Sequence, residues 1–144
     1  MIPRAPLYLG LAGLLPFLWG ALTLVSSDLA IWATKTIGPR FAGPFVLLNY
    51  GSIILAFMSG VLWGFAVKSD QPLNYALSVI PALWVFFTVG SGATSSAVYL
   101  ITGFLGLLVL DWHFSAQHLT PPWWMRLRIL LTVVVIACLS LLVI

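Results

Sequence analysis

Long apolar runs that are almost free of charge are the feature that most constrains how this chain can fold. Only 6% of its residues are charged, whereas 62% are hydrophobic. A soluble domain carries about a quarter charged residues and at most about half apolar ones, so this chain has too few polar side chains to cover a globule in water. The bilayer must therefore be its solvent, which excludes an ordinary soluble enzyme, a nucleic-acid binder and a disordered tail.

Five of these runs are predicted to be transmembrane helices. A helix needs about 20 mostly apolar residues to cross the hydrocarbon core. The runs lie near residues 7–25, 45–67, 73–90, 93–110 and 123–144. The Gly90-Ser91-Gly92 break is so short that the third and fourth helices should form a tight antiparallel hairpin. The sequence thus predicts an all-α membrane protein, a five-transmembrane-helix bundle in which residues 1–144 form a single polytopic domain.

The segment between the first two spans predicts a short helix near residues 28–37. Apolar residues recur there at helical spacing, Asp28 stands at the N-cap position, and Gly38-Pro39 ends the pattern. We expect this helix to lie in the membrane interface with Trp32 as its anchor. An irregular loop folded over the bundle is the alternative.

The positions of Lys and Arg predict the orientation of the bundle. With five spans, one side of the membrane carries Arg4, Lys68, Arg126 and Arg128, and the opposite side carries Lys35 and Arg40. Short cytoplasmic loops have an excess of such cations. We therefore expect the N-terminus inside and the C-terminus outside.

Small residues in the second span predict where the helices pack. One side of this helix carries a small residue at every fourth position: Ser52, Ala56, Gly60 and Gly64. Hydrophobic forces between helices are weak in lipid, so close backbone approach must hold the bundle together. We expect the second helix to be central, with the first and fourth packed against it and Gly103 and Gly106 of the fourth in the contact. Packing against a partner protein is the alternative.

Two charged residues in the last two helices are predicted to pair. Asp111 is expected to end the fourth helix and Arg128 to begin the fifth, both at the inner membrane boundary. A guanidinium can bind a carboxylate through two hydrogen bonds at once, which suits such a depth better than lysine does. We expect an interhelical ion pair that fixes the last hairpin. Lys68 and Arg126 are expected to contact anionic lipid headgroups.

The segment from Asp111 to His118 is the densest polar cluster, but its pattern does not predict an enzyme. Asp111 and Ser115 would share one helix face while His113 points roughly the other way, and no nucleophile elbow precedes Ser115. The two histidines would lie in one loop, whereas haem ligands in a bundle come from facing helices. We expect a solvated interfacial loop and no catalytic residue, cofactor or metal site.

Several segments together resemble a known family. They are Pro6 to Phe17, Tyr50 to Gly64, Leu110-Asp111, Pro122 to Trp124, Leu127-Arg128 and Leu131-Thr132. In this order they resemble a family of small multi-helix membrane proteins of unknown function, which occurs in proteobacteria and includes the mitochondrial transmembrane protein sixty-nine. The resemblance covers nearly the whole chain. It implies a multi-pass protein of the bacterial inner membrane, or of the mitochondrial inner membrane in a eukaryote, and it implies no activity, cofactor or catalytic residue.

Two functions from different classes fit this pattern. Because the sequence offers no ionisable residue at mid-depth, no redox ligands and no nucleophile set, we expect a non-catalytic accessory or assembly subunit of a larger inner-membrane complex, respiratory or photosynthetic. Its partners would be membrane lipids and other integral membrane subunits, and no nucleic acid. The alternative is a small lipid or quinone binding or carrier protein, with an intramembrane cavity where kinks at Pro16 and Pro81 face the second helix.

Overall fold

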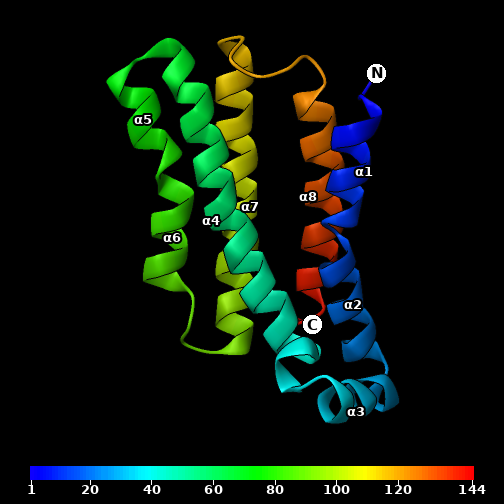
Figure 1. Ribbon diagram of the computed structural model, residues 1–144. Helices are drawn as coiled ribbons and strands as arrows, with labels where there is room; N and C mark the ends of the chain where they lie inside the picture. The colour runs from blue at the N-terminus through cyan, green and yellow to red at the C-terminus, as the bar shows by residue number, and fades with distance from the viewer.

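The computed structural model describes residues 1–144 and consists of helices joined by short loops (Figure 1). The elements are α1 (Arg4–Ala12), α2 (Leu15–Val25), α3 (Ser27–Thr36), the 3₁₀ helix η1 (Pro39–Phe41), α4 (Gly43–Ser69), α5 (Pro72–Ser78), α6 (Ile80–Thr88), α7 (Ala93–Ala116) and α8 (Trp124–Ser140). The pairs α1–α2 and α5–α6 each form one interrupted rod beside α4, α7 and α8, and α3 lies across one end of the bundle (Figure 1). The all-α prediction is confirmed.

Three helical segments are long and apolar enough to cross a membrane. They are Arg4–Val25, Gly43–Ser69 and Ala93–Ala116. Two of the predicted spans are shorter than expected: the apolar segment Pro72–Thr88 stops before residue 90, and α8 has 17 residues and ends at Ser140. Three apolar spans define the chain as a multi-pass membrane protein.

Two prolines account for the interrupted rods. Pro16 is the second residue of α2, and Pro81 is the second residue of α6. Proline lacks the backbone N–H that would continue a helix, and its ring clashes with the preceding turn, but both defects are harmless in the first turn. Each rod therefore stops and restarts just before its proline, at Gly13-Leu14 in the first and at Val79 in the second.

Helix α7 is longer than predicted, which corrects the interpretation of the polar segment that follows residue 110. The helix continues to Ala116, and Asp111 lies within it with 0% of its surface exposed. Leu107, Asp111 and Phe114 are all buried and follow helical spacing, so the packed face of α7 runs on through the carboxylate. The expectation of a solvated loop from Asp111 to His118 is therefore wrong for its first part.

Helix α3 covers the predicted residues, but a different side chain caps it. Ser26 Oγ accepts a hydrogen bond from the Leu29 backbone N–H at 3.3 Å, so Ser26 rather than Asp28 is the N-cap. Asp28 lies in the first turn, where a carboxylate favours the helix dipole. The exposed ring of Trp32 packs edge-on against Trp19, with centroids 6.4 Å apart.

Helix α4 is central, since it packs against α2, α5, α6 and α7. The largest completely buried apolar side chains are Phe17, Leu47, Leu55, Leu62, Leu100, Phe104, Leu107, Phe114 and Leu139. Two glycines outside α4 permit its close contacts. A Cβ built on Gly20 would lie 2.6 Å from Leu47 Cγ, and one built on Gly103 would lie 2.5 Å from Leu55 Cδ2.

The small-residue stripe of α4 lies on the outside of the bundle. Ala56, Gly60 and Gly64 are exposed, and a Cβ built on either glycine would meet no atom within 4 Å. The same is true of Gly106 on α7, whereas half-buried Ser52 donates its hydroxyl to the Leu48 carbonyl at 2.7 Å. The prediction that Gly60, Gly64 and Gly106 pack within the chain is wrong, because the large apolar residues of α4 and α7 form the core faces.

Candidate functional site

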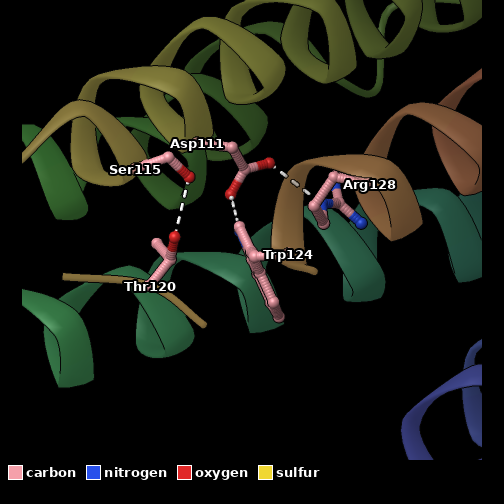
Figure 2. A network of polar contacts seen from close by, with 5 residues as sticks. All are labelled: Asp111, Ser115, Thr120, Trp124 and Arg128. Carbon is pink, nitrogen blue, oxygen red and sulfur yellow. Dashed lines mark hydrogen bonds and ion pairs between the residues drawn. The ribbon is translucent and has the colours of Figure 1, made fainter. Parts of the chain in front are cut away.

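A buried carboxylate connects α7 to α8. Arg128 Nε donates to Asp111 Oδ2 at 2.9 Å, and the two side chains are 6% and 0% exposed. Trp124 Nε1 donates to the other carboxylate oxygen, Oδ1, also at 2.9 Å, so that both oxygens are engaged (Figure 2). Trp124 and Arg128 are four residues apart on α8 and therefore project from the same face. The structure thus brings together the two residues that the sequence suggested as a pair.

The ion pair differs from the expected geometry in two respects. It uses a single guanidinium nitrogen rather than two, and it lies inside the packed bundle rather than at the end of α7. Arg128 Nη2 is buried without a hydrogen-bond partner, and so is Thr132 Oγ1 one turn further along α8. One terminal nitrogen of the guanidinium points away from Asp111 (Figure 2). Two buried hydrogen-bond donors, Arg128 Nη2 and Thr132 Oγ1, therefore have no acceptor within the chain, although the charge of Arg128 is balanced by Asp111.

A second polar network connects α5 to α7. Asn74, which is completely buried, donates through Nδ2 to Ser69 Oγ and to Gln117 Oε1, both at 2.8 Å. His113 Nε2 lies 3.1 Å from Asn74 Oδ1 and 2.8 Å from Gln117 Nε2. Because one ring nitrogen cannot donate to the first and accept from the second at once, the histidine tautomer selects one of these contacts. The network holds α5 against the last turns of α7.

Sequence reasoning missed Asn74. The only available signal is an amide in the first turn of a short, mostly apolar helix. A buried amide must be hydrogen-bonded to be tolerated. Its partner Gln117 lies 43 positions away, and that pairing depends on how α5 docks onto α7.

Replacing Gln117 with leucine should lower the stability of the protein by about 1 kcal/mol, the usual net contribution of one hydrogen bond. The change removes the acceptor of Asn74 Nδ2 but leaves the bond from the same amide to Ser69. Thermal unfolding in detergent, followed by near-UV circular dichroism, measures the effect. Gln71→Leu is the matched control because the Gln71 side chain is exposed. Equal melting temperatures for the two variants would contradict this role of Gln117.

The residues of the apparent Ser/His/Asp pattern do not meet. Asp111 binds Arg128 and Trp124, Ser115 Oγ lies 2.7 Å from Thr120 Oγ1 (Figure 2), and His113 faces Asn74. His118 is exposed in the loop after α7, with a positive φ of 59°. Asp111, His113 and Ser115 thus each link α7 to a different part of the chain, and the His118 side chain forms no such link.

Three separate hollows adjoin the kinks. One, about 420 Å³, lies between α2, η1 and α4 and is bordered by Pro16. A second, about 380 Å³, lies where α1, α2, α4, α7 and α8 meet, and both Arg128 and Thr132 line it. A smaller one, about 250 Å³, lies between α6 and α7 and is bordered by Pro81. The alternative interpretation placed one cavity between both kinks, and the structure corrects this, because no residue that lines the hollow at Pro81 lines either of the other two.

The two cations expected at lipid headgroups are exposed. Lys68 Nζ donates to the Leu119 carbonyl at 3.2 Å and lies 5.6 Å from the centroid of the Phe65 ring. Arg126, at the start of α8, forms no ion pair. Both lie at the end of the bundle where α4 ends and α8 begins (Figure 1).

The fold and these buried contacts define a small multi-pass α-helical membrane protein whose helices are joined by polar networks. The chain belongs to the family described as "Protein of unknown function (DUF3429)", whose model matches residues 2–144. It is 37% identical to Transmembrane protein 69 of Xenopus tropicalis over 141 residues, covering 93% of this chain and 51% of that protein. It is 34% identical to Transmembrane protein 69 of Mus musculus over 139 residues, covering 92% and 52%. The chain thus spans about half the length of these relatives. No solved structure matches it.

Proposed function

We propose that the chain crosses the membrane five times, through α1–α2, α4, α5–α6, α7 and α8. The five rods run along one common direction (Figure 1), which supports a shared membrane normal. Helix α8 has 17 residues, which reaches the lower limit of about 17 for a spanning helix. On this arrangement α3 lies in the interface with Trp32 as its anchor.

The N-terminus lies inside and the C-terminus outside. Arg4, Lys68 and Arg126 are at one end of the bundle, and Lys35 and Arg40 are at the other. Arg128 is buried and paired, so it does not act as a loop cation, and the excess is three against two. The larger group favours the cytoplasmic or matrix side, where Lys68 and Arg126 contact anionic headgroups.

In this membrane the chain acts as a non-catalytic accessory or assembly subunit of a larger complex. The observation that carries the proposal is the outward-facing stripe of Ala56, Gly60 and Gly64 on α4. Small residues let a neighbouring helix approach the backbone closely, and such approach is a main source of helix association in lipid. No helix of this chain takes that place, so a transmembrane helix of another subunit is its occupant.

The complex belongs to the bacterial inner membrane, or to the mitochondrial inner membrane in a eukaryote. The likeness to Transmembrane protein 69 supports a multi-pass location in general. The respiratory or photosynthetic complexes of these membranes are the assemblies to examine first.

Larger side chains at the two glycines of the α4 stripe should prevent the partner helix from binding. The double variant Gly60→Leu with Gly64→Leu places two branched side chains where a partner helix would contact the backbone, and both positions have open space within the chain. We expect at least about a tenfold loss of co-migrating subunits on native gels after gentle detergent extraction, because overpacking an interface costs more than one kcal/mol. The melting temperature of the chain should not fall, because both positions have open space and leucine favours a helix more than glycine does.

Ala137→Leu is the matched control, since Ala137 is an exposed small residue on α8. It should leave the complex intact. The proposal fails if wild-type protein migrates only as a monomer or homo-oligomer, or if the glycine variant retains its partners as well as the Ala137 variant does.

A further inference from the structure

The cavity beside the Asp111–Arg128 ion pair has the size and lining of a site for a small molecule. It has a volume of about 380 Å³, within the range of about 300–1,000 Å³ that small-molecule sites occupy. Its walls are mostly apolar, with Phe17, Ile54, Met58 and Phe104 among them. It borders the break between α1 and α2, since Gly13 and Leu14 also line it. An apolar molecule, or the apolar part of an amphiphile, fits such walls.

Three polar side chains line this cavity: Tyr50 of α4, and Arg128 and Thr132 on one face of α8. Arg128 and Thr132, four residues apart, both line it and are 5% and 3% exposed. Arg128 Nη2 and Thr132 Oγ1 are buried and have no hydrogen-bond partner within the chain. A guanidinium can only donate, and a threonine hydroxyl can donate as well. Buried donors are normally satisfied, so the pair indicates an acceptor supplied from outside the chain.

The net charge of the Asp111–Arg128 pair determines whether a neutral or an anionic acceptor fits the site. Asp111 lies 2.9 Å from Arg128 Nε and already offsets the guanidinium charge. A phosphate or carboxylate added beside Nη2 would give the buried cluster a net negative charge in surroundings that solvate it poorly. A neutral oxygen with free lone pairs, such as a carbonyl, satisfies the donors without this penalty.

We propose that the cavity binds a neutral amphiphile through a carbonyl oxygen, which accepts hydrogen bonds from Arg128 Nη2 and Thr132 Oγ1, with its apolar tail against the aromatic and aliphatic walls. A quinone with an isoprenoid chain and a fatty-acyl ester share this chemistry. The site is independent of the docking stripe on α4, whose Gly60 and Gly64 do not line the cavity. Binding involves no covalent or redox step.

The test uses the full chain purified in mild detergent and titrated calorimetrically with three probes. Decylubiquinone and monoolein carry the carbonyl, and decyl phosphate is the anionic comparison. Thr132→Val removes the hydroxyl without changing the size of the side chain or the ion pair. It should weaken binding of a carbonyl probe about tenfold, as the loss of one hydrogen bond predicts. Ser140→Ala on the same helix, whose hydroxyl donates to the Ile136 carbonyl at 2.7 Å, should leave the affinity unchanged.

The outcomes separate the two sources of the carbonyl. Binding of decylubiquinone alone assigns the site to quinones, binding of monoolein alone assigns it to acyl esters, and binding of both supports the shared chemistry. Mass spectrometry of the apolar extract of the purified protein gives the natural occupant. The proposal is overturned if neither carbonyl probe binds, if decyl phosphate binds most tightly, or if Thr132→Val and wild-type protein bind equally.

Discussion

Replacing Arg128 with methionine should destabilise the protein by about 3–5 kcal/mol, the usual effect of removing one partner of a buried ion pair. Methionine matches the arginine stem in length and apolar character, so the variant preserves packing along α8 while removing the charge. Asp111 would then be a carboxylate with 0% exposure, held only by the Trp124 N–H at 2.9 Å. The midpoint of thermal unfolding in detergent, read by fluorescence-detected gel filtration, measures the loss.

A double variant distinguishes the loss of the pair from the loss of packing. Adding Asp111→Leu to Arg128→Met removes the unpaired charge, and most of the stability should return, since buried pairs are often replaced by apolar residues at little net cost. Arg126→Met, an exposed change two residues earlier, should have almost no effect. The ion pair does not hold α7 to α8 if the Arg128→Met variant has the melting temperature of the wild type. The same conclusion follows if the double variant melts far below the wild type.

The partnership of Asp111 and Arg128 was predictable because few charges were available. With three acidic and six basic residues in 144, few pairings inside the apolar helices existed at all. The geometry was not predictable. Whether one or two guanidinium nitrogens bind, and whether Trp124 reaches the other oxygen, depends on the rotation of α8 about its axis. The periodicity of α8 does not specify that rotation, since apolar residues surround the helix on every side.

The same ambiguity explains the error over the glycines. In water the apolar face of a helix identifies its buried side, but in lipid both sides are apolar. A stripe such as Gly60 and Gly64 can therefore face either the bundle or the lipid, and the structure has it facing outward. For Gly103 the prediction of a contact with the second span agrees with the structure, since a Cβ built there would lie 2.5 Å from Leu55 Cδ2 of α4.

The two networks at one end of α7 have a common consequence for the cavity. Asn74 binds Gln117 of the α7–α8 loop, while Asp111 fixes Arg128 and hence the rotation of α8. Both constraints act on helices that line or flank the 380 Å³ hollow. The α1–α2 side of the hollow carries no such polar link to α8, and the rod is interrupted there at Gly13-Leu14. The N-terminal rod is therefore the wall of the cavity that apolar packing alone holds against α8.

Gly103→Val should destabilise the protein by about 2–3 kcal/mol through overpacking. The added Cβ alone would lie 2.5 Å from Leu55 Cδ2 and 2.9 Å from Trp84 Cδ1. Leu55 is completely buried, and Trp84 is held by its Nε1 donation to the Tyr99 carbonyl at 2.7 Å, so neither side chain can move aside without loss of packing or of that bond.

Gly106→Val on the same helix tests the explanation. It carries the same change in helix propensity, but a Cβ there meets no atom within 4 Å. We expect wild-type thermal stability for Gly106→Val and a clearly lower melting temperature for Gly103→Val. If the two variants melt together, the loss of glycine from α7 is not a packing effect, and the close approach of α7 to α4 and α6 does not contribute to stability. A lower melting temperature of Gly103→Val than of Gly106→Val would show that α7 requires a small residue at Gly103 to pack against α4 and α6.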